Sequence, residues 1–206
     1  MINKNLNNVL SISQFSESDP LAEYLPLIIF SILIFAFVVA IIIILRIIFR
    51  RRGISLIGKG MRVFISHAVS DFNRYRIAEI AKHLQKQKEI SHVYYCEDDL
   101  TGNIDDWMRK TVPRCQLLIF ISSNNSLNSN DCMNEINLAR KHNIEITPVL
   151  GVDLIWDDLD KLNIKRELGH EYDPMEFEKF CSDLSSYIRK FKIDLEREIL
   201  EKERKK

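Results

Sequence analysis

The chain has 206 residues, of which 46% are hydrophobic and 28% charged, and its 29 basic and 29 acidic residues leave no net charge. This balance excludes a global electrostatic attraction to nucleic acid, so we expect no nucleic-acid partner. The four cysteines (Cys96, Cys115, Cys132 and Cys181) form no Cys-x-x-Cys pair. Their wide spacing argues against a zinc ribbon or a redox pair and predicts reduced thiols.

The first feature in chain order is an apolar run from Leu27 to Leu45, in which only Ser31 is polar. At about 1.5 Å per helical residue, the run spans the roughly 30 Å hydrocarbon layer of a bilayer. Basic residues follow it (Arg46, Arg50, Arg51 and Arg52), and no small-x-small cleavage site does. These features predict a retained transmembrane helix over residues 25–49 rather than a signal peptide. The alternative is a buried helix of a soluble protein. It fits poorly, because the isoleucines at positions 41–44 would cover all faces of the helix.

The charges on either side of this run predict the orientation of the chain. Residues 1–24 carry Lys4 against Glu17, Asp19 and Glu23, whereas the arginines all follow the span. The positive-inside rule therefore places residues 1–24 outside and the large carboxy-terminal part in the cytoplasm, as a single-pass membrane protein. Residues 1–24 are too polar to fold alone. Residues 50–60 form a basic juxtamembrane linker, whose arginines we expect to lie on anionic lipid headgroups.

About 146 residues follow residue 60, the size of one globular domain. Their apolar runs alternate with amphipathic stretches, which predicts an α/β domain, a parallel sheet with helices on both faces, over residues 61–190. The expected strands are residues 62–66, 92–96, 117–121 and 144–150. The third is the most hydrophobic and is expected at the centre of the sheet. Pro148 suggests that the fourth lies at or near a sheet edge or end.

Helical periods follow the expected strands. Asp71 precedes one that continues through Leu84, and we expect Asp71 to be its N-cap. The other expected helices cover residues 104–111, residues 131–142 after the polar stretch 122–130, and a last amphipathic helix opened by Pro174. The charged tail, residues 191–206, has no matching apolar face and predicts a solvated helix that frays.

Several of these segments together carry a resemblance to a known family. They are Val63-Phe64-Ile65-Ser66-His67 followed by Asp71, the acidic loop Glu97-Asp98-Asp99-Leu100 with Gly102 and Trp107, and Cys132-x-x-Glu135 after a Ser-rich turn. In this order and spacing, residues 61–187 resemble a Toll/interleukin-1 receptor (TIR) domain. The resemblance implies a flavodoxin-like, five-stranded parallel sheet with helices on both faces. It also implies a domain that acts by self-association, as a signalling scaffold or as an enzyme that cleaves NAD.

The resemblance also implies site residues. Glu135 aligns with the catalytic glutamate of the family, and seven residues are placed around the nucleotide: Ser66, His67, Asp71, Glu97, Leu100, Trp107 and Ser122. Breaking the nicotinamide–ribose bond leaves an oxocarbenium-like sugar, which a nearby carboxylate can stabilise. One carboxylate suffices because nicotinamide leaves without protonation. NAD is thus the expected substrate, and neither a cofactor nor a metal is expected.

Each residue also has a purely structural interpretation. Acidic residues such as Glu135 are favoured near a helix start, His67 can cap a turn, Trp107 can belong to the core, and Glu97 can belong to a solvated or interfacial loop. In addition, His67-Ala68-Val69-Ser70 lacks the arginine that many enzymatic members place after the first strand to meet the pyrophosphate.

Two classes of function therefore stay open. One is a membrane-anchored NAD glycohydrolase, a hydrolase switched on when neighbouring domains pack together. The other is a membrane-tethered adaptor that recruits other TIR proteins. Immune or antiviral defence signalling is compatible with either. The two classes differ in whether Glu135 faces an open pocket with Ser66 and Ser122 or is held in a salt bridge.

Overall fold

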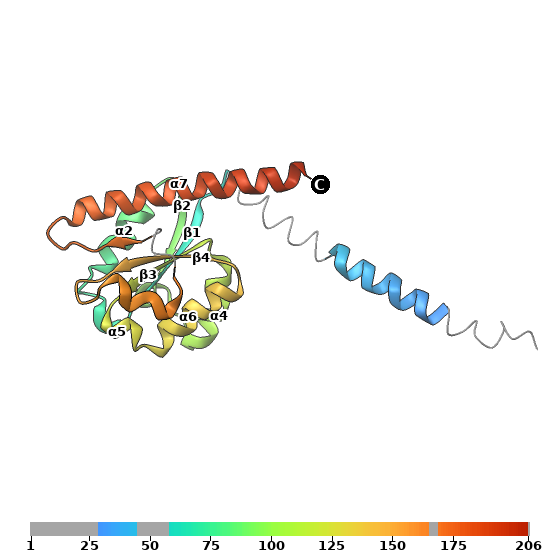
Figure 1. Cartoon of the computed structure of the whole chain (residues 1–206), viewed down its shortest axis with the longest axis horizontal. Helices are drawn as coiled ribbons and strands as arrows, with labels where there is room; N and C mark the ends of the chain where they lie inside the picture. The colour runs from blue at the N-terminus through green and yellow to red at the C-terminus, as the bar shows by residue number, and fades with distance from the viewer. Residues whose placement is uncertain (1–28, 45–57, 165–168, 206) are drawn as a thin grey trace, which may run out of the picture. The chain divides into compact units, whose positions relative to one another are not determined.

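A computed structural model describes residues 29–44, 58–164 and 169–205 (Figure 1). The chain divides into two compact units, Met1–Arg51 and Arg52–Lys206. In the first unit, residues 29–44 form a helix whose side chains are all exposed. Within the three described ranges, no helix combines the length and the apolar character that a membrane crossing needs. The ends of the expected span, residues 25–28 and 45–49, lie outside the described residues, as do residues 1–24 and most of the expected linker.

The second unit is built on a sheet of five parallel strands, in the order β2-β1-β3-β4-β5. The strands are β1 (Met61–Ser66), β2 (Ile90–Tyr94), β3 (Leu117–Ser122), β4 (Glu145–Leu150) and β5 (His170–Glu171). This order is that of flavodoxin-like folds. The expected five-stranded parallel sheet is therefore confirmed, and β3, which is buried along its whole length, is its central strand.

Helices cover both faces of this sheet (Figure 1). Two long helices, α2 (Ile77–Gln85) and α7 (Phe177–Arg204), pack against one face. The other face is covered by α4 (Ile104–Thr111) and α6 (Asn130–Lys141). Successive strand residues point to opposite faces, so in β1 Val63 and Ile65 join the first core whereas Phe64 joins the second. Shorter helices lie in the connections: η1 (Val69–Asp71), α3 (Cys96–Asp99), η2 (Val112–Arg114), α5 (Asn124–Leu127) and η3 (Trp156–Leu162).

One expectation needs correction, and two others hold. Asp71 does not cap the following helix, because Arg76 adopts a left-handed conformation (φ 53°) and α2 begins only at Ile77. The strand that carries Pro148 lies near the edge of the sheet, as expected, since β4 is second from the end, between β3 and β5. The edge strand β5 pairs only with Val149 and Leu150, so Pro148 needs no donor on that side. The charged tail is helical, as expected, because α7 runs without interruption to Arg204.

Candidate active site

The candidate site lies where the order of the sheet reverses, at the carboxyl ends of β1 and β3. Open α/β sheets bind their ligands at this switch point. Ser66 ends β1 and Ser122 ends β3, and both side chains point to the face covered by α4 and α6. Both residues are fully buried. Beyond β3 and the short helix α5, α6 is capped by Ser129, whose hydroxyl accepts a hydrogen bond from the amide of Cys132 (3.3 Å).

Glu135 on α6 is the unusual group of this region. Only 6% of the residue is exposed, and its Oε2 has no hydrogen-bond partner among the described residues. Burial, together with the nearby charges of Asp131 and Glu97, raises the pKa of Glu135 from its ordinary value of 4.5 to about 8. The Ser66 hydroxyl partly opposes this rise, yet its Oγ makes no hydrogen bond of normal geometry with the carboxyl group. No described ion pair holds Glu135, but the residue is also buried, so the described residues show it neither in a salt bridge nor open to solvent.

His67 follows Ser66 and is joined to the acidic loop. Its Nδ1 lies 3.2 Å from the carbonyl oxygen of Ala68, which can only accept, so Nδ1 carries a proton. Its Nε2 lies 3.0 Å from Glu97 Oε2, an ion-pair distance, but the ring is not aligned for a hydrogen bond. Three buried polar atoms at this edge therefore lack a hydrogen-bond partner within the described chain: Ser66 Oγ, His67 Nε2 and Glu135 Oε2. Buried polar groups are normally satisfied, so this cluster is suited to a polar ligand.

The structure does not bring all the predicted site residues together. The Asp71 carboxylate is buried and accepts hydrogen bonds from the Ser123 hydroxyl and from Asn125 Nδ2 (2.8 Å), which ties η1 to α5. The Ser122 hydroxyl donates to the Phe120 carbonyl (3.4 Å). Leu100 is exposed at the end of α3. Ser66, His67, Glu97 and Glu135 thus form the cluster.

Trp107 belongs to a different place. Its ring packs 5.4 Å from the ring of Phe64 in the core under α4. It also lines a separate cavity of about 430 Å³ with Thr101, Lys110 and Arg114. The core interpretation of Trp107 therefore matches its contacts.

Sequence reasoning missed two neighbours of the cluster. The Cys132 thiol lies near Ser66 and Glu135, and Cys96 lies near Glu97 and Glu135. Burial raises the pKa of Cys132 to about 12 and that of Cys96 to about 11, so both stay neutral, and both are free thiols. Neutral thiols are poor nucleophiles, which leaves Glu135 as the chemically distinctive group. The Cys132-x-x-Glu135 spacing was the only signal for Cys132, since residues three apart share a helix face.

The buried carboxyl group leads to a prediction about stability. Unfolded Glu135 ionises near pH 4.5 but folded Glu135 only near pH 8, so unfolding releases a proton between these values and stability falls as the pH rises through this window. Glu135→Gln removes this ionisation. We expect the variant to exceed the wild type in free energy of unfolding by roughly 2–4 kcal/mol at pH 8.5 and by much less at pH 4.5. Urea denaturation at both pH values measures this difference, with Glu178→Gln on the surface of α7 as a control that should show none.

The second unit resembles known proteins in sequence and in fold. The family model described as "TIR domain" matches residues 63–178. A search of curated proteins gives no match. Solved structures similar to this chain include the TIR domain of the Toll-related receptor TRR-2 from Hydra magnipapillata, with 17% identity, 62% of this chain and 97% of that chain covered, and a TM-score of 0.47. The RPS4 and RRS1 TIR domain heterodimer is 14% identical, with 62% of this chain and 95% of that chain covered and a TM-score of 0.48. The CMP N-glycosidase BcmB of Clostridium botulinum is 18% identical, with 61% of this chain and 98% of that chain covered and a TM-score of 0.44.

Proposed function

The chain belongs to the TIR domain family, and from this premise we propose that it is a signalling protein whose domain cleaves the nicotinamide–ribose bond of NAD when copies associate. The observation that carries this proposal is the Glu135 carboxyl group. It is buried at the switch point of the sheet, no described ion pair holds it, and it lies beside the unpartnered Ser66 hydroxyl.

In this reaction, the C1′–N bond breaks with its electron pair going to nicotinamide, which leaves as a neutral base. The ribose becomes oxocarbenium-like, and the Glu135 carboxylate stabilises the positive charge in surroundings of low dielectric. Water then attacks C1′ and loses its proton to the carboxylate, giving ADP-ribose. Attack by a group of the nucleotide itself gives a cyclic product instead. The Ser66 hydroxyl can donate a hydrogen bond to the ionised carboxylate or to the ribose.

The raised pKa of Glu135 predicts a pH dependence. Because only the ionised form stabilises the oxocarbenium ion, kcat/KM should rise with pH and level off above about pH 8. Between pH 6 and pH 8, we expect an increase on the order of tenfold or more. Initial rates of nicotinamide release between pH 5.5 and pH 9 measure this dependence. A profile that is flat from pH 5.5 upward would mean that the oxocarbenium ion is stabilised by a group with an ordinary carboxylate pKa.

Membrane anchoring forms the second part of the proposal. Residues 25–49 serve as a single span, with residues 1–24 outside and the TIR domain in the cytoplasm. The continuous apolar sequence and the exposed apolar side chains of helix 29–44 support this arrangement. Confinement to a membrane raises the effective concentration of domains and so favours their self-association.

The experiment for this proposal measures NAD turnover per domain by the full chain in lipid vesicles at low and high surface density. The free unit Arg52–Lys206 at the same total concentration is the comparison. Turnover should increase steeply with surface density. Equal turnover by the dilute free unit would show that neither the anchor nor association matters.

A second candidate function is a non-enzymatic adaptor that associates with other TIR proteins. The burial of Glu135 favours it, because a residue that is only 6% exposed meets a ribose only if the loops around it move. The adaptor predicts no binding of ADP-ribose. Calorimetric titration of the clustered chain with ADP-ribose therefore separates the two functions.

A further inference from the structure

The basic and the acidic side chains of the segments between the strands gather at opposite edges of the sheet in the second unit. The segments that precede β1 to β4 lie at the amino edge of the sheet, because parallel strands all start on the same side. These segments are residues 58–60, 82–89, 109–116 and 140–144. They hold nine basic residues (Lys59, Lys82, Lys86, Lys88, Arg109, Lys110, Arg114, Arg140 and Lys141) and one acidic residue, Glu89.

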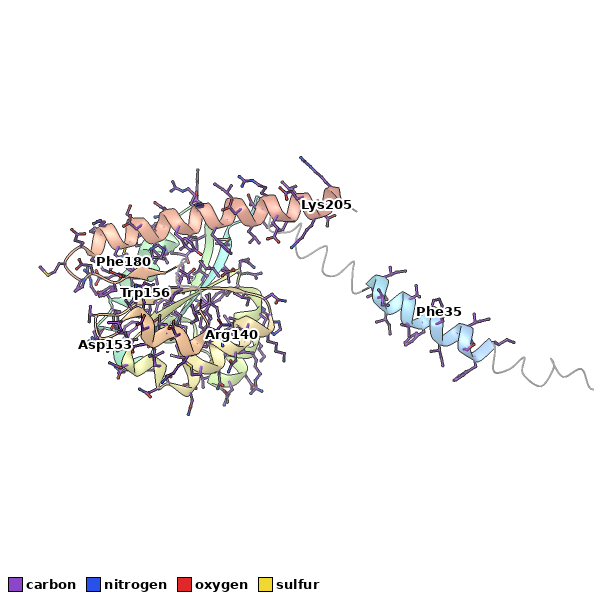
Figure 2. All side chains as sticks on the ribbon, in the orientation of Figure 1. Phe35, Arg140, Asp153, Trp156, Phe180 and Lys205 are labelled. Carbon is purple, nitrogen blue, oxygen red and sulfur yellow. The ribbon has the colours of Figure 1, made fainter. Side chains whose placement is uncertain are left out.

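The opposite, carboxyl edge has the reverse charge. The segments that follow the strands, residues 67–76, 95–103, 123–131, 151–163 and 172–179, hold twelve acidic and four basic residues. Figure 2 shows Arg140 and Asp153 on opposite sides of the sheet. Two further carboxylates lie at the first edge, Glu145 at the start of β4 and Glu196 of α7, which accepts a hydrogen bond from the Gly58 amide (3.1 Å). The nine cations still outnumber the acidic residues there, so the balanced overall composition conceals one cationic and one anionic edge. The Glu135 cluster lies toward the anionic edge.

Local helix chemistry explains only part of the cationic edge. Arg109, Lys110, Arg140 and Lys141 stand in the last turns of α4 and α6, where the helix dipole favours positive charge. Other cations of this edge, such as Lys59, Lys86 and Lys88, stand outside α-helices. The ion pairs found among the described residues involve none of the nine basic side chains. Their charge is thus available to a partner.

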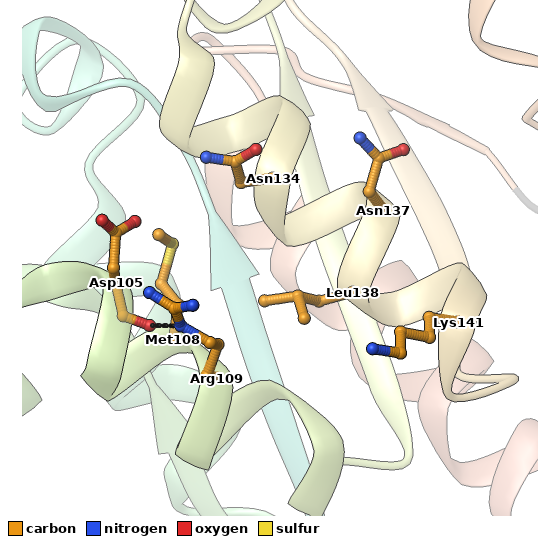
Figure 3. Close-up of a pocket in the computed structure, with 7 residues that line it drawn as sticks. All are labelled: Asp105, Met108, Arg109, Asn134, Asn137, Leu138 and Lys141. Carbon is orange, nitrogen blue, oxygen red and sulfur yellow. Dashed lines mark hydrogen bonds between the residues drawn. The ribbon is translucent and has the colours of Figure 1, made fainter.

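A groove of about 300 Å³ between α4 and α6 adds a concave site to this surface (Figure 3). Arg109 on α4 and Lys141 on α6 line its two walls, with the half-buried Leu138 between them. The Arg109 Nε–H donates to the Asp105 carbonyl (3.2 Å), which holds the guanidinium group at the groove. Asn134 and Asn137, both on α6, add their side-chain amide groups to the lining of the groove. Asp105 also lines the groove, but the two cations and two amides outnumber its carboxylate, and such donors suit a phosphate ester or a carboxylate.

We propose that the cationic edge binds the anionic headgroups of a lipid bilayer. Charge complementarity supports a surface with many negative charges, and the chain itself supports a membrane. Residues 58–60 enter β1 at this edge, and they follow the apolar run in sequence. Binding in this orientation turns the anionic edge, with Glu135, away from the bilayer and toward soluble substrate. That this edge meets a membrane in the cell rests on the proposed anchoring of residues 25–49. The existence of the cationic edge does not depend on that anchoring.

The test uses the unit Arg52–Lys206, which contains the whole sheet and both cores and lacks the apolar run. Vesicles of phosphatidylcholine with 30% phosphatidylserine are sedimented with this unit and compared with pure phosphatidylcholine vesicles. Binding should occur only on the anionic vesicles and weaken with added salt. The triple variant Arg109→Gln, Arg114→Gln, Lys141→Gln should reduce the partition coefficient about a hundredfold, since each cation near a membrane surface contributes about fivefold.

A matched control neutralises three cations at the opposite edge, Arg74→Gln, Lys161→Gln and Lys179→Gln, and should bind as the wild type does. Circular dichroism establishes that each variant is folded. Equal binding by the triple variant, or no binding to anionic vesicles, overturns the proposal. If the triple variant instead loses self-association in vesicle-free ultracentrifugation while vesicle binding is absent, the edge binds a second copy of the chain. None of these measurements uses NAD, so they stand or fall independently of the enzymatic proposal.

Discussion

Glu135→Gln is expected to lower NAD cleavage by membrane-clustered chains about a thousandfold. The amide has the same shape as the carboxyl group but cannot carry the negative charge that stabilises the oxocarbenium ion, and loss of one such electrostatic contact typically costs 10²–10³ in kcat. The KM should change little, because the interaction develops in the transition state. Nicotinamide release at saturating and subsaturating NAD measures both constants.

The control for this variant is Asp131→Asn, an exposed carboxylate four residues earlier on the same helix. It should retain activity within a few-fold. Because Glu135→Gln is expected to be more stable than the wild type above neutral pH, unfolding cannot explain its loss of activity. Equal turnover by Glu135→Gln and the wild type would remove Glu135 from the reaction.

Gly151→Ala is expected to cause a large loss of stability. A Cβ at this position would overlap severely with the Tyr75 hydroxyl and with the Ser122 carbonyl oxygen, and it would lie 2.9 Å from Tyr75 Cζ. The tyrosine cannot move away freely, because its ring is buried and its hydroxyl donates to Asp153 Oδ1 (2.9 Å). The Ser122 oxygen accepts from the Gly151 amide (2.8 Å).

Overpacking of this kind costs about 3 kcal/mol, which for a domain of this size lowers the Tm by about 10 °C. Thermal denaturation of the unit Arg52–Lys206 measures the change. Gly102→Ala serves as the comparison: Gly102 has a positive φ (75°) but no atoms within 4 Å of an added Cβ, so only backbone strain of about 1 kcal/mol is expected. A Tm for Gly151→Ala above that of Gly102→Ala would contradict the close packing of β3, β4 and Tyr75.

The sequence predicted the sheet well because its signals are local. The continuous apolar run at residues 117–121 identified the central strand, and the polar stretch 122–130 placed Glu135 near the start of the helix that follows. Its neighbourhood to Ser66 and Ser122 was implied only by the resemblance to TIR domains. The late start of α2 escaped prediction, because the left-handed conformation of Arg76 breaks a pattern that reads as helical from Asp71. The partners of Asp71 also escaped, since Ser123 and Asn125 lie more than fifty residues away in the chain.

The charge pattern illustrates the same limit. Along the chain, basic and acidic residues alternate and cancel, so composition indicates no electrostatic partner. Only the parallel topology reveals that segments preceding the strands collect the cations and segments following them collect the carboxylates. Likewise, Trp107 and Leu100 lie close in sequence to the acidic loop, but Trp107 packs into the core under α4 and Leu100 faces solvent.

The most direct test of the central claim is nicotinamide release from NAD by the full chain held at high density on vesicles. We predict turnover by the wild type and its loss in Glu135→Gln, with both proteins folded. Binding of other TIR proteins without any release of nicotinamide from the folded, clustered wild type would contradict the enzymatic account and leave the adaptor function.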